Sequence, residues 1–355
     1  MTTGVSNKAE GSRGEPAKGA SRIWTDIDFD KEGAQFGYFR LNVSSHGRVS
    51  SFVPIPVAVF KNGTGPRILL LGGVHGDEFE GQVMLMKLMR TLDVANVRGQ
   101  LIIMSAANAP AAFAGRRTSP LDEGNLNREY PGDPRGTPTQ EIAYFIDAVL
   151  LPRVDYLLDF HSGDMTTYLT PSAHVYHSPD REKFARLLHM LKVFGMPTSV
   201  ILKGLIDHDK KAIGACDRLG VLRFASELGG GGGITIDALR RAEQGLARLL
   251  YDLGALCEPI TSEPAPPIEL VTRLPNNKYV YAMATGVFEP YVKLGDDVKA
   301  GEPAGAIHFP EEPWREPLIV IFKDSGTIHA VRVHARTQMG DTLFMLSVPW
   351  KDERG

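Results

Sequence analysis

Residues 69–78 read Leu-Leu-Leu-Gly-Gly-Val-His-Gly-Asp-Glu, an apolar run that passes through two glycines into a His and a Glu. The apolar part, residues 67–71, is typical of a short strand buried on both faces of a parallel sheet. His75 and Glu78 lie three residues apart, so both side chains can turn toward one point if a helical turn begins there. The stretch therefore indicates a pair of metal ligands where a buried strand gives way to a helix.

A second strand supplies the ligand that this pair lacks. The apolar residues 156–158 are followed by Asp-Phe-His-Ser-Gly, which places His161 at the end of another buried strand. Catalytic zinc is commonly held by two His and one Glu, with water in the fourth position. Sites in open α/β sheets gather at the carboxyl ends of the strands. We predict one catalytic zinc ion held by His75, Glu78 and His161, and assign no metal role to the other histidines.

Strands and helices alternate along the rest of the first 257 residues. Strands are expected at 67–71, 101–104, 156–161, 173–176, 199–203 and 221–226, and helices at 78–92, 139–150, 181–194, 210–219 and 236–253. This alternation indicates βαβ units and a largely parallel sheet that is covered by helices on both faces. Residues 53–60 are expected to form an edge strand, because prolines cannot serve a central one. In the first helix, Phe79, Val83, Met86 and Met89 are predicted to face the core.

Composition limits the compartment and the partners of the chain. A net charge of -3 and a pI near 6.4 argue against nucleic acid or an anionic membrane as the main partner. The two cysteines, Cys216 and Cys257, are too few for a disulfide framework, which fits a reducing cytoplasm. No apolar run approaches the ~18 residues that a membrane-spanning helix needs. We expect a cytoplasmic enzyme of 355 residues acting on a small molecule.

Shifts in composition divide the chain into four parts. Residues 1–22 are almost devoid of apolar side chains and are expected to form a disordered tail. Residues 23–257 are the predicted catalytic domain, and residues 258–267 are a linker rich in Pro, Glu and Ser. Residues 268–355 lack helical patterns and read as short strands joined by turns, which indicates a small all-β domain.

Three further stretches carry candidate catalytic groups. Glu227 ends a strand and precedes five glycines, where partial burial would raise its pKa and suit it to act as a general base. The glycines are either a flexible turn or backbone kept clear of a ligand. Asn127 and Arg128 stand side by side in the long polar stretch 108–138, which suits a carboxylate held by an Arg fork and an amide. Arg116 and Arg117 offer a cation that can stabilise an oxyanion.

These motifs, taken in order over residues 72–233, resemble the succinylglutamate desuccinylase/aspartoacylase family, a branch of the carboxypeptidase-A-like zinc hydrolases. The motifs are Gly-Gly-x-His-Gly-Asp-Glu, Asn-Leu-Asn-Arg, Asp-Phe-His-Ser-Gly and the Glu before the glycine run. The resemblance implies a three-layer α/β/α domain with a mixed, mostly parallel sheet. It also implies the following roles: zinc ligands His75, Glu78 and His161, general base Glu227, carboxylate-binding pair Asn127 and Arg128, and carbonyl-polarising Arg117. Because the segment between Arg117 and Asn127 is longer than in aspartoacylase, Arg116 remains an alternative.

Within the family, residues 117–122 and 227–232 look most like the deacetylases of ectoine breakdown. That resemblance implies hydrolysis of N-α-acetyl-L-2,4-diaminobutyrate to acetate and diaminobutyrate. Asp164 departs from the glycine expected at its position. Either it meets the side-chain ammonium of the substrate or it marks a different substrate. The alternatives are a deacylase of the N-acetylaspartate or N-succinylglutamate type, a carboxypeptidase-like exopeptidase, and a non-catalytic metal-dependent binding protein.

The C-terminal domain resembles a biotinyl/lipoyl-like β fold, on the basis of residues 292–301 and 325–328. The hairpin that would carry a modified lysine instead spans residues 311–317 and contains none. Lipoylation and biotinylation are therefore not expected. We expect this domain to form a wall of the active site or a contact within a homo-oligomer.

Overall fold

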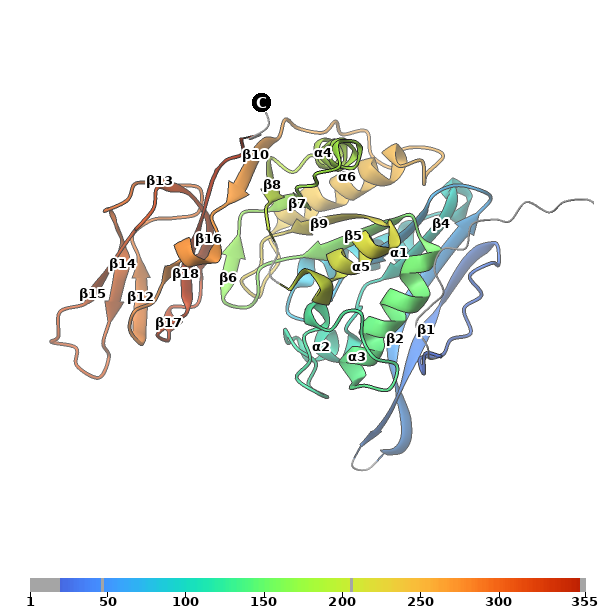
Figure 1. The fold of residues 1–355 in the computed structure, drawn as a ribbon, viewed down its shortest axis with the longest axis horizontal. Helices are drawn as coiled ribbons and strands as arrows, with labels where there is room; N and C mark the ends of the chain where they lie inside the picture. Colours follow the sequence, from blue (N-terminus) through green and yellow to red (C-terminus); the bar gives the residue numbers. More distant parts are fainter. Residues whose placement is uncertain (1–19, 46–47, 205–206, 352–355) are drawn as a thin grey trace, which may run out of the picture.

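The fold is organised around one large mixed sheet, seen in a computed structural model that describes residues 20–45, 48–204 and 207–351 (Figure 1). The catalytic part of this sheet runs, in spatial order, through β1 (Gly33–Ser45), β2 (Arg48–Asn62), β4 (Gly99–Met104), β3 (Arg67–Leu71), β5 (Tyr156–His161), β9 (Leu222–Glu227), β7 (Ser172–Tyr176) and β8 (Thr198–Leu202). The four central strands β4, β3, β5 and β9 are mutually parallel, whereas β1, β2 and β7 introduce antiparallel pairs.

Helices cover both faces of this sheet. One buried core packs the sheet against α1 (Phe79–Thr91), α4 (Arg181–Phe194) and α6 (Ile236–Asp252). A second core lies on the opposite face, against α2 (Ala109–Ala114), α3 (Pro138–Tyr144) and α5 (Ala212–Leu219). The predicted three-layer α/β/α architecture is confirmed. It forms because both faces of the central strands are apolar, so that helices must bury each face.

One prediction of strand position is wrong. Strand β2 is not an edge strand, since it lies between β1 and β4. Its prolines, Pro54 and Pro56, are tolerated because β2 pairs with β4 only from Ala58 onward, so that the stretch with the prolines has β1 as its single neighbour. The polar stretch 108–138 is largely irregular, as expected, although it begins with α2 and contains a 3-10 turn at Leu126–Arg128.

The buried stripe of α1 is rotated from the predicted one. Met84, Leu85 and Leu88 are buried, whereas Met86 is 38% exposed. The helix turns Gly81 toward β5, where a Cβ would lie 2.8 Å from the Cβ of Phe160. Hydropathy predicted the wrong face because α1 also buries the polar side chains Glu80 and Gln82, which bind neighbouring loops.

The C-terminal part extends the large sheet rather than standing beside it. After residues 261–268, which form no helix or strand, β10 (Glu269–Arg273) pairs in parallel with β8. From β10 the sheet continues through β18 (Thr342–Pro349), β16 (Gly326–Arg332) and β13 (Asp297–Val298). Two short strands pair with this part of the sheet: β11 (Val280–Tyr281) pairs with β18, and β6 (Thr167–Leu169) of the catalytic part pairs with β16. The division at residues 258–267 stays a prediction.

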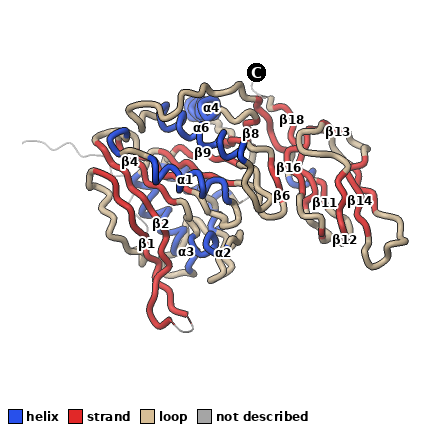
Figure 2. The backbone as a smooth tube through the Cα atoms, turned by 180° about the vertical axis from the view of Figure 1, so that it is seen from behind, coloured by secondary structure: helices blue, strands red, loops and turns tan. Residues whose placement is uncertain are grey.

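A second, smaller sheet completes the C-terminal part. Its order is β15 (Leu318–Ile321), β14 (Pro303–His308), β12 (Gly286–Pro290) and β17 (Arg336–Thr337). Side chains of both sheets, among them Phe288, Ile328 and Phe344, form a separate core. Apart from a 3-10 turn at Asn276–Lys278, the described C-terminal residues form only strands and loops (Figure 2). The predicted small all-β unit is confirmed.

Of the predicted tail, residues 1–22, the first 19 lie outside the described residues. Arg22 forms an ion pair with Glu141 of α3, and the boundary at residue 23 stays a prediction. Among the described helices, none is both long and apolar enough to cross a membrane.

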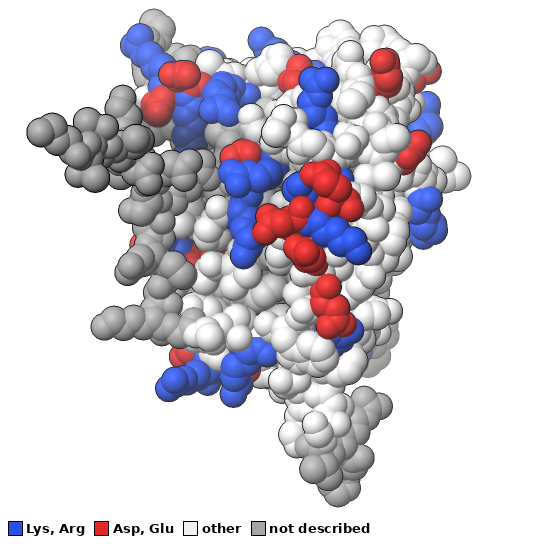
Figure 3. Space-filling model, turned by 90° about the vertical axis from the view of Figure 1, so that its right-hand side faces the viewer, with Lys and Arg blue, Asp and Glu red and all other residues white. Residues whose placement is uncertain are grey.

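On the face at the β1 end of the molecule, basic and acidic side chains lie intermixed (Figure 3).

Candidate active site

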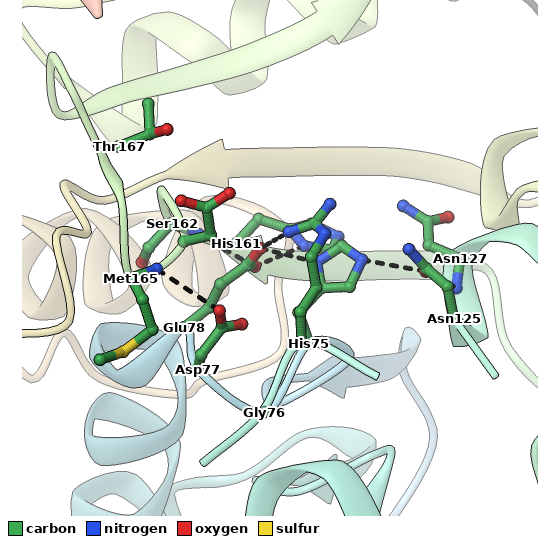
Figure 4. A network of polar contacts seen from close by, with 12 residues as sticks. His75, Gly76, Asp77, Glu78, Asn125, Asn127, His161, Ser162, Met165 and Thr167 are labelled. Carbon is green, nitrogen blue, oxygen red and sulfur yellow. Dashed lines mark hydrogen bonds and ion pairs between the residues drawn. The ribbon is translucent and has the colours of Figure 1, made fainter. Parts of the chain in front are cut away.

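The three predicted metal ligands meet at the carboxyl ends of β3 and β5. His75 lies in the loop after β3, Glu78 immediately precedes α1, and His161 is the last residue of β5. The Nδ1 atom of His75 is 2.6 Å from Glu78 Oε1, and the Nδ1 atom of His161 is 2.8 Å from Glu78 Oε2 (Figure 4). In the described part of the chain, this is the one group of three or more such side chains close enough to share an ion. Two imidazole nitrogens and a carboxylate are a donor set that fits catalytic Zn²⁺.

Gly76 is required by the close approach of α2. A Cβ at this position would lie 2.0 Å from the carbonyl oxygen of Ala111, so that any side chain would force the loop and the helix apart. The backbone N–H of Gly76 also donates to the carbonyl of Arg116. The loop that carries His75 and Glu78 is thereby held against α2 and the segment that follows it.

The outer nitrogen of each imidazole also faces a polar group. His75 Nε2 lies 3.1 Å from Asn125 Oδ1, and His161 Nε2 lies 3.2 Å from Asp159 Oδ2. The contact of His75 has the geometry of a hydrogen bond, whereas that of His161 is an ion-pair contact without it. Groups in such positions orient metal-binding imidazoles. Sequence reasoning missed both residues, although Asp159 could have been found from its position two residues before His161, on the same face of β5.

Electrostatics make this cluster a site for a cation. Burial disfavours the charge of Glu78, but the imidazoles of His75 and His161 outweigh it and hold the pKa of Glu78 low. Burial likewise opposes charge on His161, but Asp159 and Glu78 raise its pKa to about 10. The carboxylates thus favour positive charge between them, whether a proton or a metal ion supplies it.

Glu227 stands beside the ligand cluster. It is the last residue of β9 and pairs directly with His161 of β5. Its Oε2 atom is buried and has no hydrogen-bond partner among the described residues. Burial, and next the charge of Glu78, raise the pKa of Glu227 to about 7. A carboxylate with this pKa and an unsatisfied oxygen has the properties that the sequence predicted for a general base.

The glycine run after Glu227 packs against the backbone of the His161 loop. A Cβ at Gly230 would lie 2.4 Å from the Cα of Gly163. The N–H of Gly163 donates to the carbonyl of Gly229, and the N–H of Gly231 donates to the carbonyls of Asp164 and Thr167. Residues 231–232 form a turn, and the two interpretations left open by the sequence stay predictions. These glycines permit two loops to pack backbone to backbone, and so hold Glu227 and His161 in fixed relation.

A pocket of about 870 Å³ opens above these residues. It is lined by Arg117, Asn127, Arg128 and Asp164 in addition to the ligand cluster and Glu227. Arg117 Nη1 lies 3.1 Å from Glu78 Oε1, whereas the exposed Arg116 pairs with Glu123 and does not line the pocket. The geometry therefore favours Arg117 over Arg116 as the cation beside the metal ligands.

The C-terminal part forms one wall of the same pocket. Arg273 of β10, Tyr279 and Met345 of β18 all line it. Sequence reasoning anticipated such a wall but named none of these residues, because nothing in their local sequence distinguishes them from ordinary strand and turn residues. His174 of β7, which the sequence offered as a residue that could border the pocket but favoured as a structural histidine, does line it, together with Tyr176, which sequence reasoning missed. A contact between copies of the chain stays a prediction.

Comparison with known proteins gives the family of the chain. Residues 64–253 match the succinylglutamate desuccinylase/aspartoacylase catalytic domain. The chain belongs to this family. Its members include a protein of Halomonas elongata described as N-alpha-acetyl-L-2,4-diaminobutyric acid deacetylase, which is 38% identical over 92% of this chain and 95% of the relative.

Solved structures of family members superpose over most of the chain. The succinylglutamate desuccinylase/aspartoacylase of Rhodobacter sphaeroides has a TM-score of 0.86 at 35% identity, covering 93% of this chain and 100% of that structure. The product-bound ectoine utilization protein EutE (DoeB) of Ruegeria pomeroyi has a TM-score of 0.87 at 33% identity, covering 93% and 99%. Both matches include the C-terminal part, so this family member shares its whole architecture with them.

Proposed function

We propose that the protein is a zinc-dependent amidohydrolase that deacetylates N-α-acetyl-L-2,4-diaminobutyrate in ectoine breakdown. The observation that carries the proposal is the placement of Glu227 beside His75, Glu78 and His161 on adjacent strand ends. The names of the Halomonas relative and of the Ruegeria structure support the substrate. The donor set supports the metal, since a bound Zn²⁺ would polarise the acyl carbonyl and lower the pKa of a water molecule toward ~7.

The protein groups supply the proton transfers. Glu227, in its ionised form, accepts a proton from the attacking water and returns it to the departing amine. Its unsatisfied Oε2 is free to receive that proton. Arg117 donates to the acyl oxygen as negative charge develops there, and can do so from its place beside Glu78.

The loop that carries Asn127 and Arg128 binds the α-carboxylate of the substrate. Both side chains line the pocket, and Arg128 Nη1 donates to the carbonyl of Asn127 at 2.7 Å, which ties the guanidinium to its own loop. Burial, and next the charge of Arg117, lower the pKa of Arg128. A carboxylate placed here compensates both charges and brings the amide bond over the metal ligands.

Asp164 binds the side-chain ammonium of diaminobutyrate. Apart from Glu78 and Glu227, it is the one acid among the described residues that line the pocket. Its Oδ1 accepts from the N–H and the Oγ1 of Thr166, both at 2.8 Å, which fixes the carboxylate.

An Asp164→Asn variant is expected to lose about 10- to 100-fold in kcat/KM, since hydrogen bonds to charged groups contribute about 1.5–3 kcal/mol. Asn can still accept from Thr166, so the loop keeps its conformation. The measurement compares N-α-acetyl-L-2,4-diaminobutyrate with N-acetyl-L-2-aminobutyrate, which lacks the ammonium group. Only kcat/KM for the first substrate should fall, and equal losses of kcat/KM for both substrates would show that Asp164 does not bind the ammonium.

The pH dependence follows from the raised pKa of Glu227. Below that pKa the carboxyl group is protonated and cannot accept a proton, so kcat/KM should fall about tenfold for each pH unit. A bound cation favours the ionised form, and the fall should therefore begin at or below the value of about 7 that applies without metal. The measurement is the pH profile of kcat/KM, and an acid limb that begins well above that value would contradict the proposal.

One observation favours a second candidate. Lys203, Lys211 and Arg273 line the pocket together with Arg117 and Arg128, and such a set of cations suits a substrate with a second carboxylate. The deciding experiment measures kcat/KM for N-α-acetyl-L-2,4-diaminobutyrate, N-acetyl-L-aspartate, N-succinyl-L-glutamate and a blocked dipeptide. The first should be preferred. Preference for either dicarboxylate would select the second candidate, and preference for the dipeptide would indicate an exopeptidase.

A further inference from the structure

Arg223 is a buried cation four residues before Glu227 on β9. It is 7% exposed, and it pairs with Asp159 of β5, which is 1% exposed. The Nη2 and Nε atoms of Arg223 both donate to Asp159 Oδ2, at 2.6 and 3.2 Å. None of the roles described above uses Arg223.

Strand register explains how Arg223 reaches this carboxylate. Side chains alternate along a strand, so Arg223, Ala225 and Glu227 share one face of β9. Directly opposite them on β5 lie Leu157, Asp159 and His161. Ala225, opposite Asp159, is too small to fill its position, which leaves room for the guanidinium to extend along the sheet. Arg223 thereby lies diagonally behind the row that holds His161 and Glu227.

The same carboxylate oxygen faces the metal-ligand cluster. Asp159 Oδ2 lies 3.2 Å from His161 Nε2, while His161 Nδ1 points to Glu78. A continuous series of charged contacts therefore runs from the guanidinium, through two hydrogen bonds to Asp159, to the outer nitrogen of the imidazole, and the last contact is an ion pair without hydrogen-bond geometry. If Arg223 is removed, Asp159 keeps its place beside His161 only through weaker restraints, because its Oδ1 has no hydrogen-bond partner among the described residues.

A contribution to folding stability alone is a weak explanation for the buried contacts that join Arg223, Asp159 and His161. Burying two charges costs several kcal/mol per ion, and replacing a buried pair with apolar side chains is often neutral or stabilising. Leu157, directly opposite Arg223 on β5, is apolar and fully buried. We infer that Arg223 is a positioning residue, which holds Asp159 so that His161 presents Nδ1 to the metal. The inference rests on the proposed metal centre.

The test measures zinc affinity of the full-length protein by competition with a chromophoric chelator. Arg223→Met is expected to weaken zinc binding by about 10- to 100-fold, the range seen when outer partners of metal ligands are removed. Arg223→Lys keeps the charge but not the two-pronged guanidinium, and its zinc affinity should fall less than that of Arg223→Met. Asp159→Asn should lower zinc affinity about as much as Arg223→Met. The double variant should lower it no more than the single variant with the larger effect, because both residues act through one contact.

A matched control separates positioning from general stability. Arg67 pairs with Asp155 at the opposite ends of β3 and β5, with Nη2 and Oδ1 3.1 Å apart. Arg67→Met should leave zinc affinity within about twofold of wild type, even if it changes the Tm of the metal-free protein measured in the presence of chelator. Circular dichroism of the metal-free Arg223 variants confirms that they are folded before affinities are compared.

Three results would overturn the inference. Zinc affinity unchanged in a folded Arg223→Met protein, with KM raised instead, would make Arg223 a substrate-binding residue of the pocket that it lines. An equal loss in Arg67→Met would make the effect one of stability. Failure of the wild-type protein to bind zinc would remove this inference together with the proposed function. If the wild-type protein binds zinc but does not deacetylate, only the proposed function fails, because the affinity measurements need no substrate.

Discussion

Replacing Glu227 with Gln should lower kcat by about 10³-fold, within the range of 10²–10⁴-fold that general acid–base catalysis typically contributes. Gln has the shape of Glu but cannot accept and return a proton at neutral pH. No hydrogen bond is lost at Oε2 of Glu227, because this atom has no partner among the described residues. Burial raises the pKa of Glu227, so removing the carboxylate also relieves the cost of holding charge there. The variant should therefore be at least as stable as the wild type.

The measurement pairs steady-state kinetics with metal analysis of the same preparation. Metal content should be unchanged, since the ligand cluster consists of His75, Glu78 and His161. Glu243→Gln is the matched control, because Glu243 lies on the surface of α6 and pairs with Lys87 far from the pocket. Activity of the Glu227 variant within tenfold of wild type would reassign the base.

Replacing His161 with Ala should remove both the metal and the activity. His161 provides one of the three ligand atoms of the cluster, and without it the Asp159 and Glu78 carboxylates face each other with no cation between them. Metal affinity should fall by more than about 100-fold, the upper end of the effect of losing an outer partner alone. Hydrolysis should fall to the background rate.

Elemental analysis of purified protein checks the loss of metal, and chelation of the wild type provides an independent route to the same state. Activity of chelated wild type should return when Zn²⁺ is added, whereas the His161→Ala protein should not recover. His189→Gln is the control, because His189 pairs with Asp252 on the surface of the helical layer. A fully active His161→Ala protein would contradict the metal centre and the hydrolase with it.

The candidate ligands were predictable because their signals are local. His75 and Glu78 lie three residues apart next to glycines, and His161 follows a short apolar run of the kind found in buried strands. Parallel strands bring their carboxyl ends to one edge of a sheet, so the sequence implied that these side chains lie near one another. Glu227 was predictable for the same reason.

Other features escaped local reasoning. The buried face of α1 was mispredicted because Glu80 is fully buried, where its carboxylate accepts from Ser162 Oγ at 2.6 Å, and hydropathy places such a residue on the surface. The position of β2 inside the sheet was missed because prolines exclude a strand from the centre only where it has two neighbours.

By itself, the sequence determined the layered α/β architecture and the small β unit and pointed to the candidate metal ligands and the candidate base, because each is encoded in the spacing of a few neighbouring residues. Only the tertiary structure placed Arg117 rather than Arg116 in the pocket, added the wall containing Arg273, and brought Arg223 near His161 through Asp159. These relations depend on strand register and on the pairing of β10 with β8. Register and pairing are set by the packing of segments far apart in the chain, which leaves no local pattern to read.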